Sequence, residues 1–446
     1  MKISGRSGTR ELLKKFMEDE SESIQEYINV VNRFLTDSVE NISYLSVDNK
    51  LMQRLPELFG TRFRVVDLKN DMTPLKPFSG IIKDMNLPDS EIEARMYFLQ
   101  KDAFSSYLRE GRCRERIDLI SEQEFHYEKT LMQDSISEMV SRNLKTDYLF
   151  INAQYMFDEG FEILKKVETL GTEGKLVFCF DSVRSGLVSP SVTSFLSYIG
   201  KRENFLHVAK DEEHLFVPEE TGLLSEGSYG HSDVYKEITD FDVICDSLKN
   251  FRLMLAYEQA LSFCSWVKEH MRLLPFSPLQ KIMLYKEISQ IQNEAGNPDE
   301  AVLYLNKIID YQKNDDMETW AFFYMAWVFT KKKSNSMARK YALLAQKRLS
   351  VDEESPLYAL SLMIEYYVMD KTASSDIIQK YMAALEKLEN AGLYNNYVAT
   401  AVKLPWELYG KKMSRKKCSP YWTDVSAIQH FWETSTFILP PATGKP

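Results

Sequence analysis

The sequence predicts two regions of different fold class: an α/β region with a parallel sheet, followed by an all-helical region of repeated helix pairs. Up to about residue 240, short apolar runs bounded by polar residues alternate with amphipathic stretches. This alternation is typical of a parallel sheet whose faces are covered by helices. From residue 241 onward no run has the composition of a strand, and long helical patterns follow one another with short polar breaks.

The strands of the α/β region are predicted from apolar runs that are short enough to be buried strands. These runs are 64–68, 148–151 and 175–180. The helices are predicted from amphipathic stretches of helical period. These stretches are 9–37, 90–110, 122–144 and 157–170. The segment 218–232 is rich in Gly, Ser and Glu and has no such period, so it predicts a loop or linker.

The helical region repeats a short pattern at the start of every second helix. The anchors of the pattern, at spacings of 41, 37 and 40 residues, are Ala260, Ala301, Ala338 and Ile378. Small residues at three of the four anchors allow two helices to approach closely, and stacked pairs bury a continuous core. The clearest pair joins predicted helices at 279–294 and 299–312 through the turn 295–298.

These pairs resemble a tetratricopeptide (TPR-like) array. The best single unit consists of Tyr285, Ile288, Ala301, Leu305 and Ile308. The resemblance implies a superhelix whose concave surface binds a protein or peptide partner, with side chains of the first helix of each pair lining the groove. Those side chains here include Tyr285, Asn293, Trp320 and Tyr324. We expect 383–399 and the aromatic tail 421–432 to form a last helix pair or cap.

A second resemblance is carried by four segments in order along the N-terminal half. Residues 3–16 resemble a phosphate-binding loop that runs into its helix, and 73–78 resemble the loop and helix after the second strand of one ATPase group. Residues 148–159 resemble that group's second nucleotide motif, and 175–180 followed by Arg184 resemble its next strand and sensor region. The group is the AAA-like ATPase module of the STAND class of signal-transduction proteins. Its large bacterial regulators often place this module before a TPR-like array.

The two nucleotide motifs depart from the working pattern at their charged positions. The loop keeps two glycines but lacks the Lys-Ser/Thr pair that neutralises phosphate and holds Mg²⁺. The second motif has Asn152, or Ile151 in the other register, where a metal-positioning carboxylate belongs. We therefore expect a degenerate, P-loop-like pseudo-ATPase module with no catalytic residue and no metal site.

Alternatives stay open at three places. The N-terminal loop is either a weak site for ATP at a helix N-terminus or a flexible N-terminal segment capped by Ser7 or Thr9. The residues that would bind the nucleotide are Gly5, Gly8, Thr9 and Arg10. The acids Asp158 and Glu159 either bind a residual metal or suit the dipole of the helix that they begin. The basic runs 331–333 and 411–417 either contact an acidic partner or phosphate, or are solvated helix ends.

Composition excludes several classes of protein. The formal net charge of −10, from 55 basic and 65 acidic residues, argues against non-specific nucleic-acid binding. Five widely spaced cysteines without a CxxC pair indicate neither a disulfide framework nor a structural zinc site. The longest apolar run, 320–329, is far shorter than the ~20 residues that a spanning helix needs. Since the N-terminus also lacks an apolar signal segment, we expect a cytoplasmic protein with no membrane contact.

The sequence thus predicts a P-loop-like α/β region followed by an all-α, TPR-like superhelical region. The expected boundaries are 1–217 for the degenerate AAA-like module, 218–240 for the linker and 241–446 for the repeats. The expected function is non-catalytic regulation or scaffolding in signal transduction, through a protein or peptide partner of the repeats. The alternative is a nucleotide-binding switch with little or no ATP turnover. Family analogy adds transcription regulation through DNA, but no basic recognition helix is visible, and the chain could also be a fragment of a larger regulator.

Overall fold

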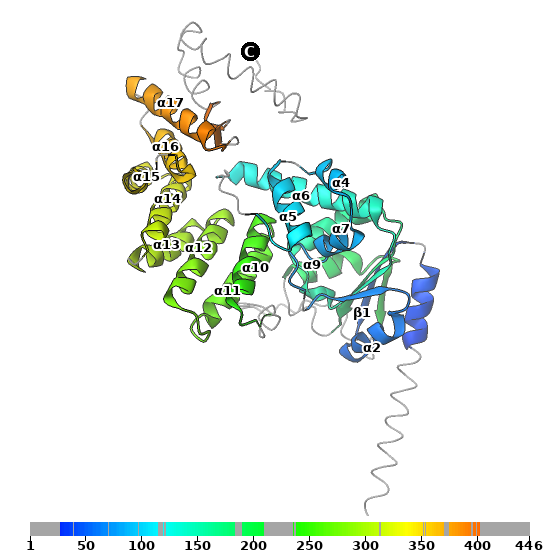
Figure 1. Cartoon of the computed structure of the whole chain (residues 1–446). Coiled ribbons are helices and arrows are strands. Elements are labelled where there is room, and N and C mark those ends of the chain that lie inside the picture. The colour runs from blue at the N-terminus through cyan, green and yellow to red at the C-terminus, as the bar shows by residue number, and fades with distance from the viewer. Residues whose placement is uncertain are drawn as a thin grey trace, which may run out of the picture. The chain divides into compact units, whose positions relative to one another are not determined.

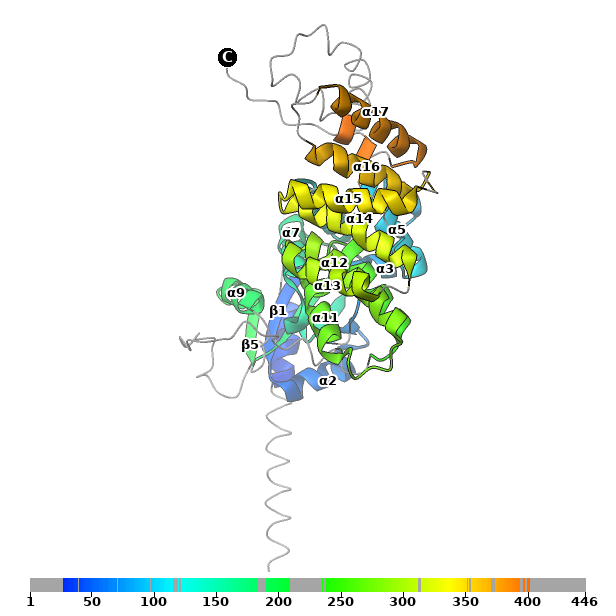
Figure 2. The ribbon, with the colours of Figure 1, turned by 90° about the vertical axis from the view of Figure 1, so that its left-hand side faces the viewer.

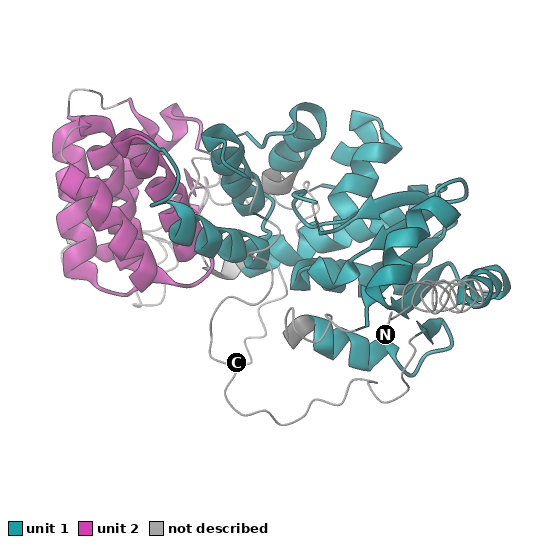
Figure 3. Ribbon diagram, turned by 90° about the horizontal axis from the view of Figure 1, so that it is seen from below, with its two compact units in different colours: residues 1–114, 126–276 teal, residues 115–125, 277–446 magenta. Residues whose placement is uncertain are grey.

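The computed structural model describes most of residues 27–401, which form parts of two compact units. Unit 1 comprises residues 1–114 and 126–276, and unit 2 comprises residues 115–125 and 277–446 (Figure 3). The positions between 27 and 401 that the structure does not describe are 39, 70, 97, 115–118, 120–121, 183–189, 209–234, 236–237, 312–313, 351, 353, 370–373, 394–395 and 398.

Unit 1 is built on a five-stranded parallel sheet. The strands are β1 (Ile42–Val47), β2 (Arg64–Asp67), β3 (Tyr148–Ile151), β4 (Leu176–Asp181) and β5 (Phe205–Val208). Their order is β2-β3-β4-β1-β5, and in the register Tyr44 of β1 lies opposite Phe178 of β4 and Phe205 of β5. Every residue of β1, β3 and β4 is buried, as expected for parallel strands that are covered on both faces.

Helices cover both faces of this sheet (Figure 1). The described helices of unit 1 are 27–37, α2 (Asn49–Phe59), α3 (Phe78–Met85), α4 (Asp89–Glu93), α5 (Phe98–Glu110), α6 (Glu122–Asn143), the 3₁₀ turn η1 (Ala153–Tyr155), α7 (Asp158–Leu170), α9 (Pro190–Ile199), α10 (Phe241–Leu253) and α11 (Tyr257–His270). On one face, Leu35 and Leu55 of the first two helices join Leu45 of β1 in an aliphatic core. On the other face the core is aromatic: Phe195 of α9 has its ring centroid 5.7 Å from that of Tyr44.

The described part of unit 2 is all helical. Its helices are α12 (Pro278–Glu294), α13 (Pro298–Tyr311), α14 (Asp315–Lys331), α15 (Asn335–Leu349), α16 (Pro356–Val368) and α17 (Ser374–Asn390). Each helix packs against the next one in the chain (Figure 2), and a core that includes Leu305, Phe323, Ala342 and Leu360 runs through α13 to α16. A side chain caps the start of α12: Ser277 Oγ accepts from the Gln280 backbone N–H at 3.2 Å in a capping box.

The three strands expected from sequence are confirmed as β2, β3 and β4, and two more strands were not expected. The helical stretch 122–144 corresponds to α6 and 157–170 to α7, whereas 90–110 is two helices, α4 and α5. The expected helix at 383–399 is wrong in its bounds, because α17 spans Ser374–Asn390 and ends before Gly392, which has a φ of 69°. The aromatic tail 421–432 lies outside the described residues.

The repeated anchors lie near the starts of the second helices: the three alanines are each the fourth residue of α11, α13 and α15, and Ile378 is the fifth residue of α17. Ala260, Ala301 and Ala338 are fully buried, so a larger side chain at any of them would separate two helices. Although the repeats were expected to begin at residue 241, unit 1 extends to Phe276 and includes α10 and α11. Among the described residues, no helix is long and apolar enough to cross a membrane.

Candidate functional site

The carboxyl ends of the strands are where parallel sheets bind ligands, with phosphates at the N-terminus of the following helix. In this sheet α2 begins directly after β1, with only Asp48 between them. Asp48 Oδ1 accepts a hydrogen bond from the Leu51 backbone N–H at 2.8 Å. The N-terminus of α2 therefore already carries a carboxylate, whose negative charge opposes a phosphate at the same place.

A chain of polar side chains crosses the ends of β2, β3 and β4. Asn152, with a left-handed φ of 60°, donates from Nδ2 to Asp67 Oδ1 at 2.8 Å. Its Oδ1 accepts from Gln154 Nε2 at 3.2 Å. Gln154 Oε1 in turn accepts from the Asp181 backbone N–H at 3.1 Å. The Asn152 amide, at one of the two positions where the resemblance leads us to expect a metal-positioning carboxylate, is used on both sides as a link between strands.

A buried lysine holds the loop that follows β2. Lys76 Nζ donates to the carbonyl oxygens of Leu68 at 3.0 Å and Asp71 at 3.1 Å, and it lies 5.2 Å from the centre of the Phe157 ring. Burial lowers the pKa of Lys76 to about 8, and Asp71 and Asp67 partly oppose that shift. Its contacts with the protein satisfy this amine, so Lys76 fixes the loop between β2 and α3.

The helices α7 and α11 cap each other's N-termini, because neither has a capping side chain of its own. The Asp158 backbone N–H donates to Glu258 Oε2, and the Glu258 backbone N–H donates to Glu159 Oε1 at 2.9 Å. Lys129 Nζ of α6 lies 3.3 Å from the same Glu159 oxygen. We call Lys129, Asp158, Glu159 and Glu258 the carboxylate junction.

The carboxylate junction is crowded with negative charge. Glu159 is only 2% exposed, and burial, with Glu159 and Asp158 nearby, raises the pKa of Glu258 to about 8. Near neutral pH Glu258 therefore carries a proton for much of the time, which relieves its repulsion with the buried Glu159 carboxylate. The two acids that the sequence places at the start of this helix, Asp158 and Glu159, both take part in the cap between α7 and α11. Glu159 does so through its carboxylate and Asp158 through its backbone N–H.

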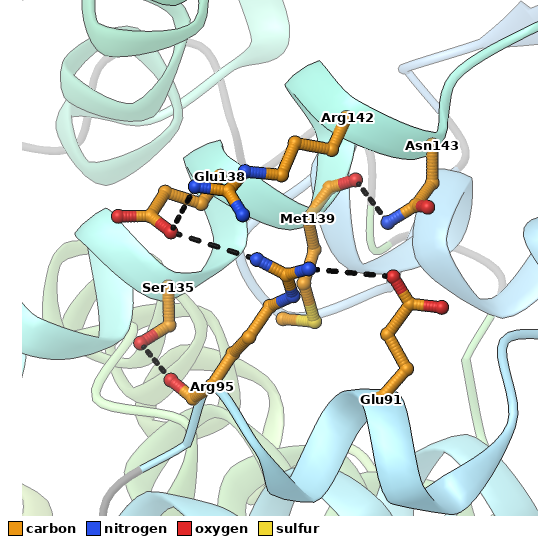
Figure 4. A network of polar contacts seen from close by, with 7 residues as sticks. All are labelled: Glu91, Arg95, Ser135, Glu138, Met139, Arg142 and Asn143. Carbon is orange, nitrogen blue, oxygen red and sulfur yellow. Dashed lines mark hydrogen bonds and ion pairs between the residues drawn. The ribbon is translucent and has the colours of Figure 1, made fainter.

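A separate polar network joins the end of α4 to α6 (Figure 4). Arg95 contacts Glu91 at 3.5 Å and Glu138 at 3.7 Å, and Ser135 Oγ donates to the Arg95 backbone carbonyl at 2.7 Å. Arg142 contacts the same Glu138 oxygen at 3.5 Å. Because these charges pair with one another, the network fixes α4 against α6.

In unit 2, lysines lie over aromatic rings on α12, α13 and α14. Lys286 Nζ lies 5.1 Å from the Trp320 ring centre. Lys307 Nζ lies 4.9 Å from the Tyr285 ring centre and 4.7 Å from that of Tyr304. We call these five residues the aromatic–cation cluster. Trp320, Tyr285 and Lys286 are half-buried and Lys307 is exposed, so the cluster can present rings and positive charge to a partner.

Of the four groove side chains expected from sequence, two are half-buried and two are buried. Tyr285 and Trp320 belong to the aromatic–cation cluster, but Asn293 and Tyr324 are only 1% and 3% exposed. These two bond to each other in the interior, where Asn293 Nδ2 donates to Tyr324 Oη at 3.1 Å. Buried side chains of this kind position the helix and cannot touch a peptide.

Lys286 and Lys307 belong to none of the motifs that are visible in the sequence. Lys307 follows Tyr304 by three residues, a spacing that places both side chains on one helix face, so this pair could have been found from sequence. The basic run 331–333 is partly used inside unit 2: Lys331 Nζ donates to the Asn293 carbonyl at 3.3 Å and Lys332 pairs with Asp299.

The proposed nucleotide-binding residues Gly5, Gly8, Thr9 and Arg10 lie outside the described residues, as does the basic run 411–417. Within the part that the structure describes, no group of three His, Cys, Asp or Glu side chains is arranged to hold a metal ion. Comparison of the chain with protein-family models, with curated proteins and with solved structures found no match.

Proposed function

We infer that this protein is a non-catalytic regulatory or scaffolding protein of signal transduction, which binds a protein or peptide partner through its TPR-like helical region. The observation that carries this inference is the aromatic–cation cluster on α12, α13 and α14. Trp and Tyr rings that are partly exposed and held by neighbours are the side chains that most often dominate binding at protein interfaces. Lys286 and Lys307 add positive charge, which favours a partner with carboxylates at its surface.

The polar chain at the carboxyl ends of the strands supports a non-catalytic role. Asp48 caps α2 at the place where a phosphate would bind, and Asn152 is bonded to Asp67 and Gln154. A nucleotide bound at these strand ends would have to displace both arrangements. The alternative is a nucleotide-binding switch that uses Gly5, Gly8, Thr9 and Arg10. It predicts that the chain binds ATP through these residues and not at the strand ends.

The test of partner binding is affinity capture from cells of the source organism, followed by quantitative mass spectrometry. The bait is the full chain, as wild type and as Lys286→Glu with Lys307→Glu. We expect one or a few proteins to be retained by the wild type and reduced about tenfold or more by the double substitution. Lys281→Glu, a charge reversal on the same helix as Lys286, is the control and is expected to retain them. Equal retention by all three baits would contradict the proposal.

The alternative is tested by calorimetry with ATP and ADP, with and without Mg²⁺, on the full chain. We expect no binding at millimolar nucleotide. Tight, Mg²⁺-dependent binding that Arg10→Ala abolishes would instead favour the switch.

A further inference from the structure

Helix α15 carries a charge opposite to that of the chain. Its fifteen residues include four basic side chains and no acidic one, whereas the whole protein has a formal net charge of −10. The basic residues are Arg339, Lys340, Lys347 and Arg348. A helix that only faces water usually mixes both signs of charge, so this bias points to a surface with an acidic counterpart.

The two faces of α15 differ in size and polarity. Its inner face consists of alanines, Ala338, Ala342 and Ala345, all fully buried against the neighbouring helices. The opposite face borders a shallow concavity of about 610 Å³. The described residues that line this concavity are Ser336, Arg339, Lys340, Leu343, Leu344 and Lys347. In Figure 2 this helix lies on the viewer's side of the helical region.

Only some of the basic side chains of α15 pair within unit 2. Arg348 contacts Asp315 at 3.2 Å and Glu318 at 2.9 Å, and Arg339 lies 4.0 Å from Glu365. For Lys340 and Lys347, no described carboxylate lies within 4.0 Å. Leu343, which is 43% exposed, lies between these two lysines on the same stripe of the helix. The lysines are seven residues apart, about 10 Å along the helix axis.

We propose that this face of α15 binds an acidic amphipathic helix of a partner protein. Two carboxylates of the partner, two helical turns apart, pair with Lys340 and Lys347, and an apolar side chain between them packs on Leu343 and Leu344. The two lysines are as far apart as residues i and i+7 of the partner helix, which would carry the carboxylates. Leu343 and Leu344 lie opposite positions i+3 and i+4 of that helix, which would carry the apolar side chain. This surface is separate from the aromatic–cation cluster and goes beyond the function proposed above.

The apolar centre of the surface favours a peptide over a nucleic acid. A phosphate backbone offers charge at regular spacing but no apolar group for Leu343, and the acidic chain as a whole repels a polyanion. A membrane surface would need a broad apolar face on the helix, whereas the outer side of α15 presents two leucines between cations.

The test is selection of a phage-displayed library of 16-residue helical peptides on the immobilised full chain. The wild type is compared with Lys340→Glu/Lys347→Glu, and the affinity of the best peptide is measured by fluorescence anisotropy. We expect enriched peptides with Asp or Glu seven residues apart around a Leu, Ile, Met or Phe. We expect at least about tenfold weaker binding by the double variant, because two attractions become two repulsions.

Two further variants separate charge from packing. Leu343→Gln keeps every charge of the surface and should weaken binding about threefold or more. Lys145→Glu/Lys201→Glu, which reverses two exposed lysines of unit 1, should bind as wild type and controls for net charge. Enriched peptides without acidic residues, or equal affinity for wild type and Lys340→Glu/Lys347→Glu, would overturn the proposal. So would a selection that enriches no peptide while duplex DNA or phosphatidylglycerol vesicles bind at these two lysines.

Discussion

Asn152 serves two neighbours that require opposite hydrogen-bonding groups. Its amide nitrogen donates to the Asp67 carboxylate and its amide oxygen accepts from Gln154. An aspartate at this position would still accept from Gln154, but it would turn a second carboxylate towards Asp67 at hydrogen-bond distance. The neutral amide at position 152 therefore suits both of its neighbours, whereas a carboxylate would suit only Gln154.

Close packing at this end of the sheet also depends on Gly160, in the first turn of α7. A Cβ atom at this position would lie 2.6 Å from the Lys76 carbonyl oxygen and 3.2 Å from Met156 Cε. The carbonyl belongs to the loop that the buried Lys76 amine holds in place, so it cannot move aside alone. The approach of α7 to this loop thus requires the absence of a side chain.

We predict that Gly160→Ala lowers the free energy of unfolding by about 1–3 kcal/mol, measured by urea denaturation. Gly80→Ala is the matched control, because Gly80 also lies in a helix but its Cβ would be 3.8 Å from Thr73 Oγ1, an ordinary contact. There the better helix propensity of alanine should leave stability unchanged or raise it by up to ~1 kcal/mol. Equal effects of the two substitutions would show that the close approach at Gly160 is not limiting.

Among the elements, α7 and α11 share the most unusual contact, the carboxylate junction. Glu258 is protonated in the folded state at pH values where it is ionised in the unfolded chain, since its pKa is about 8 instead of 4.5. The stability that this proton contributes is complete below about pH 4.5 and is lost as the pH rises through 8. Two other charged groups act on the Glu258 carboxylate: Asp158 repels it, and Lys129 attracts it.

We predict that Glu258→Gln, which cannot titrate, gains stability relative to wild type as the pH rises. The difference in unfolding free energy should be smallest at pH 5 and should reach about 1–3 kcal/mol at pH 9, as measured by urea denaturation at both values. Glu203→Gln, at an exposed glutamate of unit 1, should follow wild type throughout. A difference that stays constant from pH 5 to 9 would mean that Glu258 titrates normally.

The strands β3 and β4 come from almost wholly apolar runs and were found from sequence. Apolar content does not explain the other two, because β2 was found although it contains Arg64 and Asp67, whereas β1, with buried Ser43 and Ser46 among four apolar residues, was missed. The strand β5 includes His207 and is only four residues long. Of the site residues, Glu159 was noted but its partner Glu258 was not, because no local pattern reveals that two helix ends distant in the chain will meet.

At the scale of the whole molecule, the repeat spacing predicted the helix pairs but did not reveal which helices join which unit. The Asn250 amide of α10 donates to the Gly111 carbonyl at 3.1 Å, and Gln259 of α11 donates to the Thr73 carbonyl at 3.1 Å. These contacts join residues more than a hundred positions apart, beyond the reach of any periodicity. In unit 2, Leu119 is likewise held by Asn396, through hydrogen bonds of 3.3 Å and 3.0 Å to its backbone.

The chain can be divided either after α11 or before α10. A fragment of residues 1–276 keeps α10 and α11, whereas a fragment of residues 1–240 follows the boundary that the sequence favours. In the shorter fragment the Asp158 N–H loses its acceptor on Glu258, and Glu159 loses the Glu258 N–H and keeps only its contact with Lys129. The lost hydrogen bond of Glu159 and the lost cap of α7 each cost about 1 kcal/mol.

We therefore expect the fragment 1–276 to unfold in one cooperative transition and to show slow amide exchange in α7. The fragment 1–240 should unfold at a urea concentration at least about 1 M lower, and the first turn of α7 should exchange rapidly. Urea denaturation and hydrogen-exchange mass spectrometry of both fragments measure these differences. Equal midpoints and equal protection of α7 would mean that α10 and α11 contribute nothing to the sheet region, and the boundary at residue 240 would then be the correct one.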